Sequence, residues 1–229
     1  MQKLTGYIKI CFSAAILLSG TAITAQLNGL QPANEPVPSI ISPDTSAPKT
    51  LTADEREKAI MLLRSSGAGV ATAIKDLTPA QLAFKPAPDR WSIQECVQHI
   101  AASETTLWTM VETGLKQPAN PAKRSAIAMS DTALVTAVED RSRRNTTFAA
   151  LEPKNSTYKT APDALAGFNE ARGQHIAFVE KTDADLRNHV LELPLGTFDT
   201  YQFILLVAAH SQRHTQQIEE VKASAGYPK

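Results

Sequence analysis

The sequence is poor in cysteine, in aromatic residues and in net charge. It has 2 cysteines in 229 residues, aromatic side chains make up 6%, and 23 Lys and Arg balance 23 Asp and Glu. A balanced charge without a basic stripe argues against a protein that binds nucleic acid by neutralising phosphates. Hydrophobic residues still make up 43% of the chain, which is enough for one substantial core.

The first 25 residues lack a full membrane-spanning run but have the features of a signal peptide. Lys3 and Lys9 precede the uncharged stretch Ile10–Ala25, which is shorter than the ~20 residues that comfortably span a bilayer. Small residues end this stretch and suit cleavage after Ala25. We expect residues 1–25 to be removed, leaving a periplasmic or secreted protein without stable membrane insertion. A retained anchor is the less favoured alternative.

Signal cleavage would remove Cys11 and leave Cys96 as the single cysteine of the mature chain. Export permits disulfides, but one thiol cannot form one internally. The stability of the domain must therefore come from its core. In this setting Cys96 is more simply a small buried hydrophobe than a metal ligand or a nucleophile.

Residues 26–50 carry little charge and show no hydrophobic periodicity. The segment contains Pro32, Pro36, Pro38, Pro43 and Pro48. This composition is typical of an extended linker. We expect a disordered Pro-rich linker at 26–50 and one folded domain at 51–225.

Helical periodicity and capping signals divide the folded domain into four principal helices. Thr52–Glu55 and Ser92–Glu95 are capping boxes that open the first two. The expected helices cover about residues 53–77, 93–114, 162–181 and 199–223. No strand pattern of any strength is present, although residues 189–193 are expected to be extended. The fold class predicted is all-α, a four-helix bundle.

A shorter stretch between the second and third helices has helical spacing but a polar middle. Asp131–Leu151 places Leu134 and Val138 at helical intervals around Arg141, Arg143 and Arg144. We expect a helical insertion that covers the bundle. An arginine run of this kind more often forms a solvated face than an anion site.

Two histidines lie on the apolar face of the last helix. His210 and His214 are four residues apart, so their rings share the stripe that includes Leu206 and Val221. A buried imidazole without a partner costs roughly 1–3 kcal/mol. A divalent metal would satisfy both rings, but this spacing alone also arises by chance.

A third histidine strengthens the metal hypothesis. His99 lies on the inward stripe of the second helix, with Cys96 and Ile100. Three neutral imidazoles hold Zn²⁺ or Ni²⁺ at ~2.0–2.2 Å and leave coordination positions open for chemistry. We therefore predict that His99, His210 and His214 bind a divalent metal ion, zinc or nickel. His175 and His189 are expected to be structural.

The sequence does not identify a catalytic base. Glu95 lies one turn before His99, but its place in a capping box competes with a role at the site. Ser103 and Gln217 lie on the same stripes as the histidines, where hydrogen bonds to the ligands and plain core polarity are equally good interpretations.

Two motifs and a turn resemble the DinB-like family, which includes YfiT-type metalloenzymes. They are Trp91–Ile100 on the second helix, His210–His214 on the last, and the turn at Thr182–Leu186. The resemblance extends over Leu51–Val221. It implies a four-helix bundle in an up-down-down-up arrangement, with a divalent metal held by the three histidines.

The resemblance leaves several functions open. Family members include thiol-dependent S-transferases and isomerases, so the chain is expected to be a metal-dependent hydrolase or a thiol S-transferase that acts on a small molecule. An export signal argues against intracellular thiol cosubstrates. The alternatives are a non-catalytic exported bundle with a structural metal, and a partner-binding module with an exposed apolar patch. Bundles of this kind often form homodimers.

Overall fold

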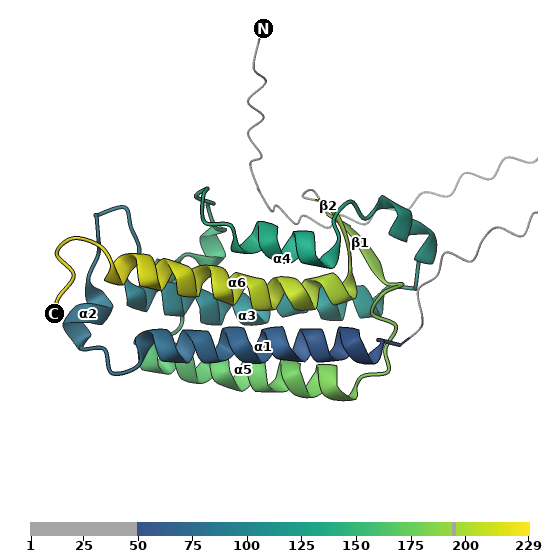
Figure 1. The fold of residues 1–229 in the computed structure, drawn as a ribbon, viewed down its shortest axis with the longest axis horizontal. Helices are drawn as coiled ribbons and strands as arrows, with labels where there is room; N and C mark the ends of the chain where they lie inside the picture. The colour runs from purple at the N-terminus through teal and green to yellow at the C-terminus, as the bar shows by residue number, and fades with distance from the viewer. Residues whose placement is uncertain (1–49, 194–195) are drawn as a thin grey trace, which may run out of the picture.

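A computed structural model describes residues 50–193 and 196–229. The predicted signal peptide and nearly all of the predicted linker lie outside the described residues. Four long helices form the body of the protein (Figure 1): α1 (Ala53–Ile74), α3 (Ile93–Lys116), α5 (Ala161–Lys181) and α6 (Thr200–Lys222). The predicted four-helix bundle is confirmed. Within the described ranges, no helix is long and apolar enough to cross a membrane.

The four helices run in the predicted up-down-down-up order. α6 packs against α1 and α3, and α5 packs against the other side of the same two helices. The Tyr201 hydroxyl donates to the Glu55 carbonyl, 2.8 Å away, so α1 and α6 start at the same end. Arg56, at the start of α1, donates to the Thr182 carbonyl just after α5, so these two helices are antiparallel.

Capping side chains define where the helices begin. The predicted boxes at Thr52 and Ser92 both form, each with reciprocal side-chain and backbone bonds to a glutamate three residues later. Asp199 caps α6 in the same way. The first helix ends at Ile74, earlier than predicted, because Thr78 caps a separate short helix, α2 (Pro79–Ala83).

The core runs along the inner faces of the four long helices. Its fully buried side chains include one or more from each: Leu63, Ile100, Phe168, Ile204 and Ile218. Burial of a side chain of this size contributes about 1.5–3 kcal/mol to folding. This core holds together the two helices that carry the candidate metal ligands, α3 and α6.

The predicted helical insertion is only partly helical. α4 (Asp131–Glu139) packs on the outside of α6, between the short 3₁₀ turns η1 (Pro121–Ala126), η2 (Ala149–Leu151) and η3 (Pro153–Asn155). Residues 140–148 form a loop, where a continuous helix was expected. The Arg213 side chain donates to the carbonyls of Val138, Asp140 and Arg143, and so holds the chain in this non-helical path.

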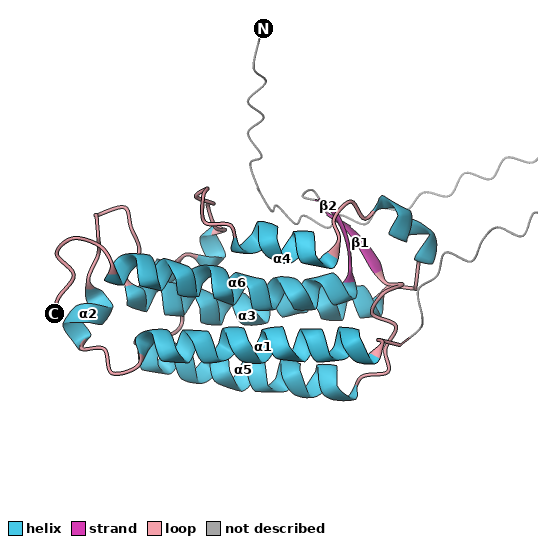
Figure 2. Ribbon diagram, in the orientation of Figure 1, coloured by secondary structure: helices cyan, strands magenta, loops and turns pink. Residues whose placement is uncertain are grey.

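A β-hairpin joins α5 to α6 (Figure 2). β1 (Val190–Leu193) confirms the predicted extended segment, and it pairs antiparallel with β2 (Gly196–Asp199), which was not predicted. Val190 lies opposite Asp199 in the register. The hairpin places Asp199 where it both ends the strand and caps α6.

Candidate metal centre

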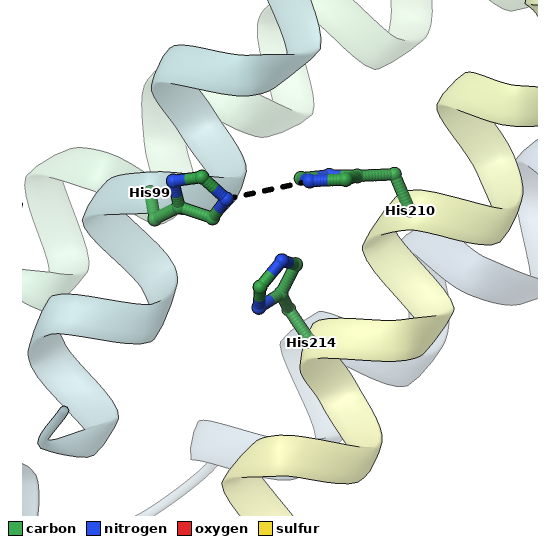
Figure 3. Close-up of side chains that lie close together, drawn as sticks. All are labelled: His99, His210 and His214. Atoms are coloured by element: carbon green, nitrogen blue, oxygen red, sulfur yellow. Dashed lines mark hydrogen bonds between the residues drawn. The ribbon is translucent and has the colours of Figure 1, made fainter. Parts of the chain in front are cut away.

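Three histidines from two helices meet inside the bundle (Figure 3). His99 comes from α3, and His210 and His214 lie one turn apart on α6. One ring nitrogen from each lies within 4.8 Å of the others. The Nε2 atoms of His99 and His210 are 3.3 Å apart. The structure therefore brings together the three residues that the sequence predicted as ligands.

Hydrogen bonds to the outer nitrogens orient two of the three rings. His99 Nδ1 donates to the Leu151 carbonyl oxygen at 2.9 Å, and His214 Nδ1 donates to Gln217 Oε1 at 2.9 Å. An oxygen of this kind only accepts, so each Nδ1 carries the hydrogen. Nε2 of each ring then carries a lone pair that a metal ion can use, as in metal-binding histidines.

The imidazoles are held in the neutral form. Burial lowers the pKa of His99 to about 4. Burial, and then the neighbouring imidazoles, lower the pKa values of His210 and His214 well below 6.5. Neutral imidazole is the form that binds metals, so no proton needs to be displaced from these rings at pH 7.

The donor set fits a divalent ion of the zinc type. Two nitrogens that each lie ~2.0–2.1 Å from a tetrahedral zinc ion are roughly 3.3–3.4 Å apart. The observed 3.3 Å between the Nε2 atoms of His99 and His210 matches this spacing. Within residues 50–193 and 196–229, no further His, Cys, Asp or Glu joins the group. Three ligands of this kind leave a coordination position open.

Trp91 and Ser103 complete the immediate surroundings. The Trp91 ring lies 4.8 Å from the His99 ring and 6.0 Å from that of His214, measured between centroids. Ser103 Oγ is 3.3 Å from His99 Nε2 and is fully buried. A cavity of about 380 Å³ borders Trp91 and Gln217, both of which contact the histidines. None of the three histidines lines this cavity, so Trp91 and Gln217 lie between it and the centre.

The other titratable residues considered from the sequence have different partners. His175 bonds to Glu104, and His189 bonds to the Gly114 carbonyl. Cys96 is buried, which raises the pKa of its thiol, so it stays protonated. Glu95 is committed to the Ser92 backbone and to Lys85. None of these four belongs to the histidine group.

One sequence prediction near the centre is wrong. Arg141 was expected on a solvated face with Arg143 and Arg144, yet its side chain is only 17% exposed. It forms two hydrogen bonds to Glu220 and one to Gln217. The loop brings it onto α6, a contact across 76 residues that the local pattern could not reveal. Arg143 and Arg144 are exposed, as predicted.

Sequence reasoning also missed a buried pair of charged residues next to the centre. Glu104 on α3 and Arg172 on α5 form two hydrogen bonds of 2.7 Å. Nothing in the local sequence around either charge identifies its partner on the other helix. Only their shared position on inward stripes of two helices could have indicated the pair.

A family model for the DinB superfamily matches residues 62–218 of this sequence. The chain belongs to the DinB superfamily. The family expected from the two histidine motifs is thereby confirmed, and the match spans all three histidines.

A solved structure agrees with this assignment at the level of the fold. The chain is similar to YfiT from Bacillus subtilis, described as a probable metal-dependent hydrolase with an unusual four-helix bundle topology. The TM-score is 0.53 at 17% sequence identity, over 80% of this chain and 94% of that one. A comparison with curated proteins finds no match.

Proposed function

We propose that this DinB-superfamily protein is a metal-dependent hydrolase whose divalent ion, zinc or nickel, is held by His99, His210 and His214. One observation carries the proposal: three neutral imidazoles present their nitrogens to one point within the bundle. The fold shared with YfiT, itself described as a probable metal-dependent hydrolase, supports the same reaction class.

A bound divalent ion with an open position lowers the pKa of water and polarises a carbonyl or phosphoryl oxygen. The protein's own part is to hold the ring nitrogens and to keep the site partly dry. Leu151 and Gln217 orient two of the rings, and Trp91 covers two of them. We propose that a small substrate approaches the ion through the cavity lined by Trp91 and Gln217, the two residues of that lining that contact the histidines.

Hydrolysis is favoured over thiol transfer, the other reaction expected from the family. Hydrolysis requires only water as the second reactant, whereas transfer requires a separate thiol. The protein's own thiol at Cys96 is buried and protonated. We also propose export, on the strength of the signal-like residues 1–25, and intracellular thiols would then be out of reach.

A partner-binding role has less support. That role predicts a sizeable exposed apolar patch away from the histidines. In the described part of the chain, Met61 is the one large hydrophobic side chain that is exposed. A single side chain does not make a patch.

The proposal is tested by metal content and by activity on the same preparation. Full-length protein purified without a metal-affinity step should hold close to one equivalent of zinc or nickel, or take it up on reconstitution. Ester, amide and phosphoester substrates should then reveal an activity that chelation removes and zinc restores. His99→Ala should lose both metal and activity. Wild-type protein with less than a tenth of an equivalent after reconstitution would refute the proposal.

A further inference from the structure

A short chain of contacts leads from His214 to the loop after α4. Gln217 Oε1 accepts from His214 Nδ1 at 2.9 Å and from Arg141 Nη1 at 3.4 Å. Arg141 is itself held by Glu220, through bonds of 3.0 Å from Nε and 2.7 Å from Nη2. Gln217 and Glu220 lie about one turn apart on α6, whereas Arg141 comes from the loop.

The Gln217 side-chain amide is the one group in this series of contacts that can take two orientations. It has an oxygen that accepts and an NH₂ group that donates, and rotation by half a turn exchanges them. If the NH₂ group faced His214, then Nδ1 would accept and the hydrogen would move to Nε2. An imidazole with hydrogen on Nε2 has no lone pair there for a metal. The orientation of Gln217 therefore decides whether His214 can be a ligand.

Arginine only donates hydrogen bonds, so Arg141 admits one orientation of the amide. With Arg141 Nη1 on one side, the Gln217 atom between it and His214 must be the oxygen. His99 needs no such device, because its partner is the Leu151 backbone carbonyl, which cannot rotate independently. The two ligands thus differ in what fixes their tautomers.

We propose that Arg141 is a positioning residue that locks the Gln217 amide and thereby keeps His214 in its metal-binding tautomer. The inference rests on the proposed metal centre. It also assigns a role to the loop of residues 140–148, which delivers Arg141 to α6. The competing interpretation is that Arg141 only anchors this loop through Glu220.

The tautomer itself is measured on metal-free protein. Selective ¹⁵N-histidine labelling and long-range ¹H–¹⁵N correlation should show His214 protonated at Nδ1 in the wild type. Arg141→Ala should give a mixture of both tautomers. Arg143→Ala is the matched control, since it removes a guanidinium from the same loop without touching Gln217. An unchanged His214 tautomer in Arg141→Ala would overturn the inference.

The second measurement is the affinity of each variant for zinc, determined by letting the protein compete with a chelator for the metal. Loss of a partner that orients a metal-binding histidine typically costs 10–100-fold, and we expect about tenfold for Arg141→Ala because its contact is long. Arg143→Ala should bind zinc as the wild type does. Arg141→Met keeps the aliphatic part of the side chain and replaces Arg141→Ala if that variant does not fold.

A double-mutant cycle separates locking from anchoring. Gln217→Glu presents oxygen in either orientation, so it needs no lock. In that background Arg141→Ala should no longer weaken zinc binding or change the His214 tautomer. An equal loss in both backgrounds would mean that Arg141 only anchors the loop, and would overturn the inference. A tautomer shift in Arg141→Ala, together with no zinc binding by the wild-type protein, would refute the proposed function while leaving the effect of Arg141 on His214 standing.

Discussion

Two buried polar clusters lie within the same bundle, and they differ in whether their members satisfy one another. The first is the metal centre of His99, His210 and His214. The second is a core ion-pair cluster made of Glu104, Arg172, His175, Ser66 and Ser211, drawn from all four long helices. Both consist of side chains that are costly to bury.

The core ion-pair cluster is complete in itself. Arg172 donates to both oxygens of Glu104 at 2.7 Å, and also to the Leu63 carbonyl and to Ser66 and Ser211. His175 bonds to Glu104 at 2.8 Å and stacks on Trp108, with ring centroids 3.8 Å apart. Every donor meets an acceptor, so a further ligand has nothing to bind.

The metal centre has the opposite character. His99 and His214 turn their donors outward and point their acceptor nitrogens toward a common space. Ser103 and His210 offer hydrogen bonds to His99 Nε2, whereas a cation would bind one nitrogen of all three rings at once. Burial of polar groups alone therefore does not mark a site, whereas the convergence of three ring nitrogens on one space does.

The largest expected effect is the loss of metal binding when one ligand is replaced. His210→Gln has a side chain of similar size that can still donate to His99 Nε2. We expect zinc affinity to fall by more than the roughly 100-fold seen for outer partners of ligands. Metal-free stability should stay within about 1 kcal/mol of wild type, since a hydrogen bond of this kind contributes about that much. Chelator competition and urea unfolding measure the two quantities. Retained zinc binding would contradict the assignment of His210.

A change in the core ion-pair cluster should lower the stability of the protein and leave its zinc affinity unchanged. Glu104→Gln leaves Arg172 buried without a counter-charge, which typically costs about 3–5 kcal/mol. Urea unfolding should show this loss, while the zinc affinity of the folded fraction stays at the wild-type value. A loss below about 1 kcal/mol would mean that the cluster is less isolated from water than the structure shows.

Acid should weaken the two clusters in different pH windows. In metal-free protein the pKa of His99 is about 4, against 6.5 when unfolded, so the unfolded state binds its proton first. His99 alone should therefore lower stability by up to about 3 kcal/mol as the pH drops from about 6.5 to about 4. His99→Gln should make this part of the curve less steep, and His210 and His214, whose pKa values are also lowered, should account for the slope that remains.

Glu104 responds only at lower pH. Burial opposes its ionisation, but the bonds from Arg172 and His175 outweigh this and lower its pKa below 4.5. Its contribution is present above pH 4.5 and is lost as the pH falls through the lowered value. Unfolding curves measured from pH 7 to pH 3 should resolve the two windows. A wild-type curve that is flat between pH 6.5 and 5 would contradict this difference.

The smallest expected effect concerns one serine in each cluster. Ser66→Ala removes an acceptor from Arg172 and should cost about 1 kcal/mol with or without zinc. Ser103→Ala should cost about the same in metal-free protein, where the hydroxyl bonds to His99 Nε2, but close to nothing with zinc bound. Thermal unfolding of both variants with and without zinc measures the difference. If zinc changed the stability cost of Ser66→Ala and Ser103→Ala equally, this distinction between the clusters would not hold.

Most of the helices and the three histidines were predictable because their signals are local. Thr52 and Ser92 open their helices through partners three residues away. His210 and His214 share a face because of helical spacing. The errors fall where distant contacts prevail: Arg213 holds residues 140–148 as a loop, and Glu220 draws Arg141 out of solvent.

The local sequence is enough to predict four amphipathic helices and the inward faces on which His99, His210 and His214 lie. Both properties depend on residues within a turn or two of one another. The closed bundle brings these rings into one space and selects which nitrogen of His99 and of His214 carries the hydrogen. Those selections rest on the Leu151 carbonyl, 52 residues from His99, and on Arg141, 76 residues from Gln217. Contacts over such separations exist only when the whole bundle closes, because chain entropy prevents them in any shorter piece.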